Sequence, residues 1–198
     1  MKIFKTVVLS AFLFVAMYAI GFCDVDWSSV NYPIVKFMAK YYDVEPITVV
    51  SVGQRMEKYD DDTSVLLYLA NNASVDPFEI LEKRIEGKTW VELFKKYKVK
   101  LTPLFLEAGN NIPERFRYAY AQYAAHKKNP NYKMKLYDTN IRDLVQLNLL
   151  KKAFNLEPRN VMKSVNNGAS FAELIEQQLD KHEFQYEPEP KLEDTDIE

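Results

Sequence analysis

The chain has 198 residues, 47% of them hydrophobic and 27% charged, a composition typical of a globular protein that buries a core. Its five glycines disfavour β-sandwiches, β-barrels and glycine-rich phosphate loops, and its single cysteine excludes an intramolecular disulfide and a Cys-based zinc site. A formal net charge of −2 offers no electrostatic attraction for nucleic acid, so nucleic-acid binding is not expected.

The N-terminal segment, from Met1 to Cys23, has the pattern of a secretory signal peptide. Two lysines precede an apolar run over residues 7–22, as in the positive and hydrophobic regions of such signals. Small residues at the −3 and −1 positions place one cleavage site after Gly21, and a second lies after Cys23. We therefore expect an exported protein, periplasmic or extracellular, without a membrane span once the signal is removed. An exported chain without disulfides fits a bacterial envelope or medium better than a eukaryotic secretory route.

Two alternatives to a cleaved signal stay open. The apolar run of about 16 residues falls short of the roughly 20 needed to cross a bilayer, but it could stay attached as an uncleaved N-terminal anchor. Cys23 could instead carry the lipid of a lipoprotein, although such a cysteine follows a small residue and here Phe22 precedes it.

The chain beyond the signal contains an internal repeat. A gap-free shift of 81 positions aligns a copy near residues 62–97 with a second copy near 143–178. A fainter half-copy, displaced by 31 positions, places Pro46 over Pro77 and predicts a helix there, although the β-branched run 47–52 is also compatible with a strand. Helix-boundary and apolar positions coincide under the larger shift, including Asp62 with Asp143, Pro77 with Pro158, Gly87 with Gly168, Trp90 with Phe171 and Glu92 with Glu173.

Each copy predicts three short helices. In the first copy, apolar residues recur at helical spacing after Asp62. Asp76 is expected to cap a second helix that ends at Gly87, where a left-handed residue is favoured. Thr89 and Glu92 have the spacing of a capping box for a third helix. Because the second copy repeats this pattern, the expected fold class is all-α, with short helices packed as helical hairpins.

A further helix is expected between the two copies, and an acidic tail after them. The helix is expected to start within residues 111–114 and to run to about Lys127, with one face formed by Phe116, Tyr120, Tyr123 and Ala124. Residues 186–198 carry six acidic residues, one lysine and two prolines, a composition that predicts a disordered tail. The helical domain is then expected to span residues 24–185.

The helix-boundary residues of the two copies follow the pattern Pro-x-x-Ile/Val…Gly-x-Thr/Ser-Trp/Phe. It is carried by Pro77 to Leu93 and, less tightly, by Pro158 to Leu174. In this pattern the chain resembles uncharacterised exported bacterial proteins built from short helical repeats. The resemblance covers about half of the chain beyond the signal, and it implies a compartment and a fold class but no activity.

Several polar and aromatic residues are candidates for function, but helix chemistry explains most of them. Asp60, Asp61 and Asp62 come just before a helix, where capping and the helix dipole favour acidic residues over a calcium site. Trp90 and Phe171 occupy equivalent positions and are interpreted as core anchors rather than a ligand shelf. His126 and His182 have no second ligand at metal-binding spacing. We therefore expect no catalytic, cofactor-binding or metal-binding residue.

The function expected from the sequence is a non-catalytic protein-interaction or structural role. A mixture of basic and aromatic residues marks Arg115, Arg117 and Tyr118 as a candidate partner surface for an unknown protein or envelope component. The alternative is a cell-wall-directed enzyme, or an accessory subunit of one. An enzyme would require a polar constellation in a cleft, and the sequence predicts no buried polar cluster. Residues 77–97 also have the spacing of a helix-turn-helix, but the second helix is apolar and mixed in charge.

The position of signal cleavage is testable by mass spectrometry of the mature protein purified from its own cells. Cleavage after Gly21 leaves a free thiol close to the new N-terminus, whereas cleavage after Cys23 leaves a chain that starts at Asp24. An intact N-terminus would identify an anchor, and a lipid mass on Cys23 would identify a lipoprotein.

Overall fold

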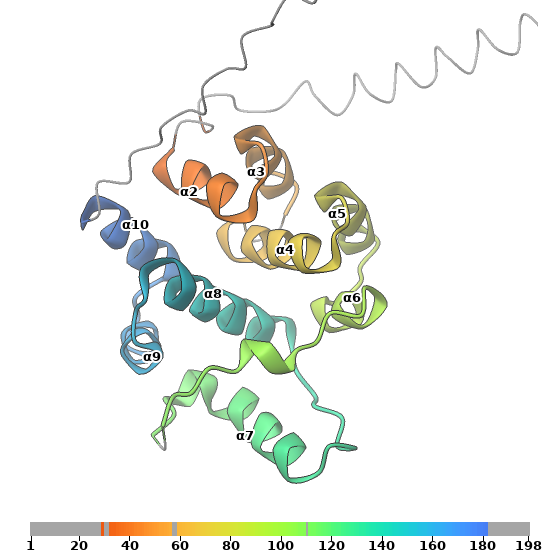
Figure 1. The fold of residues 1–198 in the computed structure, drawn as a ribbon, viewed down its shortest axis with the longest axis vertical. Coiled ribbons are helices and arrows are strands. Elements are labelled where there is room, and N and C mark those ends of the chain that lie inside the picture. The colour runs from red at the N-terminus through yellow and green to blue at the C-terminus, as the bar shows by residue number, and fades with distance from the viewer. Residues whose placement is uncertain (1–28, 30–31, 57–58, 110, 182–198) are drawn as a thin grey trace, which may run out of the picture.

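The computed structural model describes residue 29 and residues 32–56, 59–109 and 111–181 (Figure 1). Within these residues all regular elements are helices, which confirms the all-α prediction. The expected signal peptide, the acidic tail and His182 lie outside the described residues. In chain order the helices are α2 (Pro33–Tyr42), α3 (Pro46–Gly53), α4 (Tyr59–Ala73), α5 (Pro77–Ile85), α6 (Trp90–Lys96), the 3-10 turn η2 (Thr102–Leu104), α7 (Glu114–Lys128), α8 (Asp138–Phe154), α9 (Pro158–Asn166) and α10 (Phe171–Lys181).

Proline and left-handed residues set the boundaries of these short helices. A proline occupies the first position of α2, α3, α5 and α9, where its missing N–H costs no hydrogen bond. The helix expected after Pro46 is thereby confirmed, and the strand alternative is wrong. After α2, α4 and α8 the chain turns through a left-handed residue, namely Asp43, Ser74 and Asn155. In the described part of the chain, no helix is long and apolar enough to span a membrane.

Side-chain caps begin three helices of the two expected copies; those of α6 and α10 lie at matching positions, whereas Glu157, aligned with Asp76, makes no cap. Asp76 accepts a hydrogen bond from the Phe78 N–H at 2.8 Å. The Thr89 N–H donates to Glu92 at 2.8 Å, and the Ser170 N–H donates to Glu173 at the same distance. These contacts satisfy backbone groups that a helix start leaves unpaired.

The boundaries of the later helices recur at the spacing found in the sequence. Helices α5 and α9 begin at Pro77 and Pro158, two residues that the repeat shift aligns. The same interval separates the first residues of α6 and α10. Gly87 and Gly168, which are also aligned by this shift, both have a positive φ, of 86° and 106°.

Helix α8 lies at the centre of the molecule. Every residue from Asn140 to Leu150 is buried, because α4, α6, α7, α9 and α10 all pack against this helix (Figure 1). Its contact with α4 is the most extensive one between two helices. Trp90 and Phe171 are both buried, which confirms their interpretation as core anchors.

Helix α7 lies at one end of the molecule, between two long connections, and packs on α8 and α9 (Figure 1). Its inner face contains Phe116 and Ala119, both buried, with Tyr120 and Tyr123 half-buried beside them. The expectation that Ala124 shares this face is wrong, because it is exposed. The outer face of α7 is therefore charged at both ends, with Ala121 and Ala124 exposed between them.

The left-handed turn at Gly87 predicts the effect of adding a side chain there. A Cβ at Gly87 would meet no atom within 4 Å, so the cost of Gly87→Ala is conformational alone. We expect a loss of about 1–2 kcal/mol in the free energy of unfolding, measured by urea denaturation. Gly87→Asn should lose less, because asparagine tolerates this conformation better. An alanine variant as stable as the parent would contradict the prediction.

Candidate functional site

A buried ion pair joins the first turns of α4 and α8. The carboxylate of Asp62, only 1% exposed, accepts hydrogen bonds from Arg142 Nε at 2.6 Å and from Nη2 at 3.0 Å. Trp90 Nε1 donates a third bond to the same carboxylate at 2.7 Å. The capping hypothesis for Asp62 is therefore wrong, because α4 starts at Tyr59 and the side chain faces the core. The expectation of no buried polar cluster is wrong as well.

A second ion pair covers the other side of Trp90. The guanidinium of Arg84 lies 4.7 Å from the centre of the indole ring, and its Nη2 is 2.7 Å from Asp138 Oδ2. Asp138 also accepts the backbone N–H of Trp90 at 2.8 Å. The indole is thus enclosed by charged groups from three other helices, which fixes its orientation.

Asp143, the next residue after Arg142, forms the corresponding pair with α7. Its carboxylate accepts bonds from Arg115 Nε at 2.9 Å and from Nη2 at 2.7 Å. The same guanidinium lies 5.8 Å from the ring centre of Phe171, the residue that the repeat shift aligns with Trp90. Unlike an indole, a phenyl ring has no N–H to donate, so Asp143 receives no bond corresponding to that of Trp90.

The electrostatics of these pairs follow from burial and from hydrogen bonding. Burial lowers the pKa of Arg142, but its hydrogen bond and charge attraction to Asp62 outweigh burial and leave the pKa raised. The hydrogen bond to Asp143 raises the pKa of Arg115. Each guanidinium therefore stays charged, and both carboxylates are held in two-point contacts.

This cluster is suited to structure rather than to proton transfer. A general acid or base must exchange its proton with a substrate, and both carboxylates here are committed to arginine. His126 places Nδ1 2.9 Å from the Tyr132 carbonyl oxygen, which ties the end of α7 to the following loop. No group of three His, Cys, Asp or Glu side chains within the described residues could hold a metal ion.

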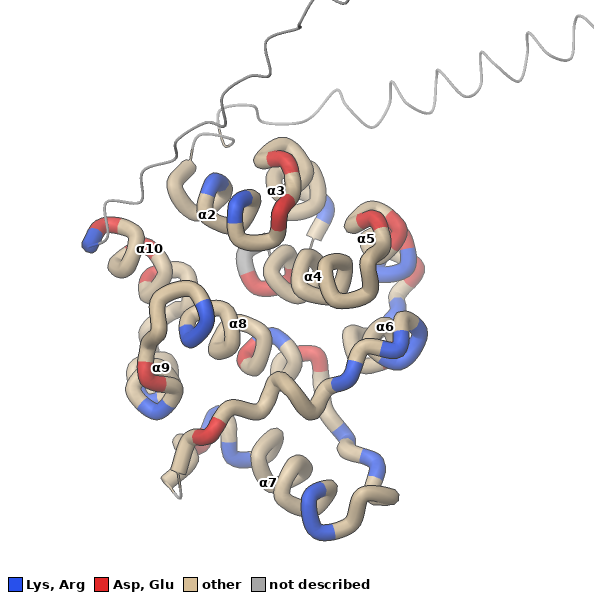
Figure 2. Tube along the Cα trace, in the orientation of Figure 1, with Lys and Arg blue, Asp and Glu red and all other residues tan. Residues whose placement is uncertain are grey.

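Lys and Arg lie at both ends of α7 and along the loop leading to α8 (Figure 2), and exposed tyrosines lie in the same region. Tyr118 and Tyr137 are 39% and 65% exposed, and their ring centres are 5.4 Å apart. In the described part of the chain no ion pair forms at the five exposed cations of this region. We call these seven residues the α7 surface: Arg117, Tyr118, Lys127, Lys128, Lys133, Lys135 and Tyr137.

The structure separates the three residues predicted for a partner surface. Arg117 and Tyr118 are exposed on α7, whereas Arg115 turns back to Asp143, with its side chain still 44% exposed. Tyr137 and the four lysines were missed by sequence reasoning. The sequence does show a local excess of positive charge that could have indicated them. Residues 114–137 contain six Lys and Arg and one acidic residue.

The chain matches no family model, no curated protein sequence and no solved structure. Its function is therefore inferred from the geometry of these residues.

The two aspartates should differ in what they contribute to stability. Asp62→Ala leaves Arg142 buried without a partner, and we expect a loss of about 3–5 kcal/mol in the free energy of unfolding. Asp143→Ala also leaves Arg115 without its partner, but this guanidinium reaches solvent. The expected loss in the free energy of unfolding is therefore smaller, about 1–3 kcal/mol. Urea denaturation of both variants measures the difference. Equal losses would contradict the assignment of Asp62 as the more important partner.

Proposed function

We propose that the chain is an exported, non-catalytic interaction protein of the bacterial envelope or medium, and that its α7 surface binds an acidic partner. The proposal rests on the five cations of that surface, which form no ion pair with any other described residue. Three of them lie on α7 and two on the loop that follows it, in a chain whose formal net charge is −2. A local excess of one sign attracts the opposite sign and orients the approaching partner.

The exposed tyrosine pair gives this surface a second means of binding. A tyrosine presents a rigid apolar ring and a polar hydroxyl, and tyrosine and arginine are enriched in protein interfaces. Tyr118 and Tyr137 stand side by side among the cations, so a partner could pack on the rings while its acidic groups meet Lys133 and Lys135. We infer a protein or another envelope component with closely spaced acidic groups as the partner.

We further infer that α4–α6 and α8–α10 are two copies of one repeat unit that supports the α7 surface. The matching helix starts and the two left-handed glycines, all related by the same shift, support this inference. The likeness to exported bacterial helical-repeat proteins belongs to the same proposal. Arg115 attaches α7 to the second unit through Asp143, so the surface rests on a fixed base.

A non-catalytic role is supported by the state of the buried carboxylates. Both Asp62 and Asp143 are bound at two points by arginine, and a catalytic carboxylate must be able to release such a partner.

A charge-matched pair of triple variants tests the α7 surface. Arg117→Gln, Lys133→Gln and Lys135→Gln together remove three cations from it, whereas Lys95→Gln, Lys98→Gln and Lys100→Gln remove three exposed cations elsewhere. At about 0.5 kcal/mol for each charge, the first variant should bind immobilised poly-L-glutamate about tenfold more weakly at low salt. The control should keep at least half of the parent's affinity. Equal losses would show that only net charge matters and would overturn the proposal.

A photo-crosslinking amino acid at Tyr118 tests the partner in the organism's own cells. We expect one dominant crosslinked partner of acidic composition. The same amino acid at Ile85, 63% exposed on α5, serves as the control and should not capture that partner. Capture of the same partner from both positions would contradict binding at the α7 surface.

A further inference from the structure

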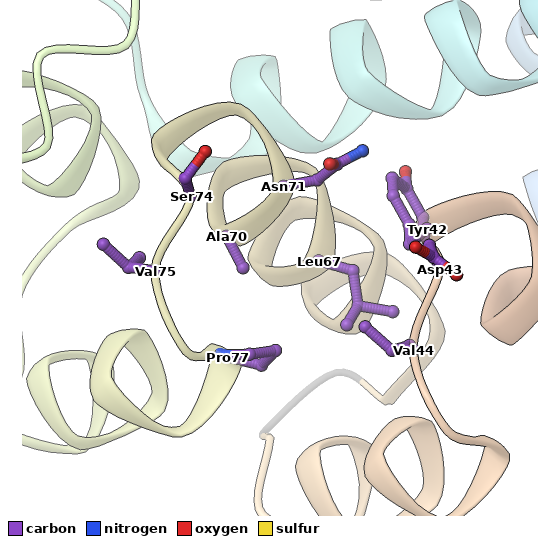
Figure 3. A pocket seen from close by; sticks show the side chains of 9 residues that line it. All are labelled: Tyr42, Asp43, Val44, Leu67, Ala70, Asn71, Ser74, Val75 and Pro77. Atoms are coloured by element: carbon purple, nitrogen blue, oxygen red, sulfur yellow. The ribbon is translucent and has the colours of Figure 1, made fainter.

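A pocket of about 300 Å³ lies where α2 and α4 end (Figure 3). Tyr42 and Asp43 reach it from the end of α2, Asn71 from the last turn of α4, and Ser74 from the turn that follows. Apolar side chains, among them Val44 and Leu67, form the rest of the wall. The pocket is thus polar on one side and apolar on the other.

The polar side of this pocket is electronegative. Helices α2 and α4 both present their C-terminal ends to it, and the carbonyl groups there carry partial negative charge. The carboxylate of Asp43, exposed at the left-handed turn after α2, adds a full negative charge. Within the described residues, no hydrogen bond or ion pair engages that carboxylate.

The polar groups at the pocket also lack protein partners. Tyr42 is only 4% exposed, and its buried hydroxyl forms no hydrogen bond within the described residues. A buried hydroxyl without a partner costs stability, and other parts of the Tyr42 side chain line the pocket. In the part of the chain that is described, the side chains of Asn71 and Ser74 are unpaired as well.

The corresponding turn after α8 indicates which ligand chemistry fits. The repeat shift aligns Asn155 with Ser74, and the two residues have nearly the same φ, 53° against 54°. At Asn155, Lys151 Nζ donates a hydrogen bond to Oδ1 at 2.9 Å, which places an ammonium at the C-terminal end of the helix. The residue aligned with Lys151 in the first copy is Ala70, which lines the pocket and has no ammonium to offer.

We propose that this pocket binds an alkylammonium group, the chemistry of a lysine side chain or of a small aliphatic amine. The ammonium would meet Asp43 and the carbonyl ends of α2 and α4, and its stem would lie on Val44 and Leu67. The ligand thus takes the place that Lys151 fills in the second unit. This site is separate from the α7 surface and opposite to it in charge.

An NMR titration of the ¹⁵N-labelled protein tests the proposal, followed at the amides of Val44, Ser74 and Val75. The probes are pentylamine and Nα-acetyl-lysine N-methylamide, with pentan-1-ol as the uncharged control. We expect saturable shifts for an amine, with a dissociation constant on the order of millimolar for so small a ligand, and none for the alcohol. Binding of both amines would indicate a lysine side chain as an acceptable source, and binding of pentylamine alone would indicate a free amine.

Two exposed carboxylates provide a matched control. Asp43→Asn removes the pocket charge, and because asparagine tolerates the left-handed turn, the variant should fold and bind the amine about tenfold more weakly. Glu45→Gln removes the same charge just outside the pocket and should leave binding unchanged. Tyr42→Phe removes only the buried hydroxyl, so it should keep or raise the thermal midpoint. Absence of saturable shifts up to about 50 mM amine, equal shifts with pentan-1-ol, or full binding by Asp43→Asn would each overturn the proposal.

Discussion

The bidentate ion pair between Asp62 and Arg142 is the interaction on which the rest of the fold depends. It joins residues 80 positions apart, across the most extensive helix contact in the molecule, and the carboxylate also holds Trp90. Two charges buried together gain little over apolar packing, but removing either one leaves the other unpaired in the core. The main effect of the pair is therefore to destabilise other packing registers of α4 on α8. In any such register, both charges would be buried without a partner.

Helix α8 also fixes the position of α7 and therefore of the α7 surface. Arg142 and Asp143 are neighbours in the chain, and the first faces α4 while the second faces Arg115 of α7. A shift of α8 would therefore displace Arg142 and Asp143 together and disrupt both ion pairs. The placement of the exposed tyrosines and lysines thus depends on charges that are themselves buried.

Local chemistry predicted the helices well and their assembly poorly. Pro77, Gly87 and the Thr89–Glu92 box act within a few residues of one another, so their effect is visible in the sequence alone. The partner of Asp62 is 80 residues away, and three consecutive aspartates near a helix start have a simple local explanation that conceals it. Arg115 presented the same difficulty, because basic residues beside tyrosines suggest an outer surface and only the position of Asp143 reveals that it turns inward.

Helix α4 connects the core pair with the pocket that we assign to an alkylammonium group. Asp62 in its first turn holds Arg142, and Asn71 in its last turn lines the pocket, about 14 Å farther along the helix. The α7 surface is attached instead through α8, so the two sites share the core but no side chain. Because one site is cationic and the other electronegative, the groups proposed to bind at them have opposite charges. In our proposal an acidic partner binds at the α7 surface and an alkylammonium group binds in the pocket, and the two ion pairs of α8 hold the helices that carry these sites.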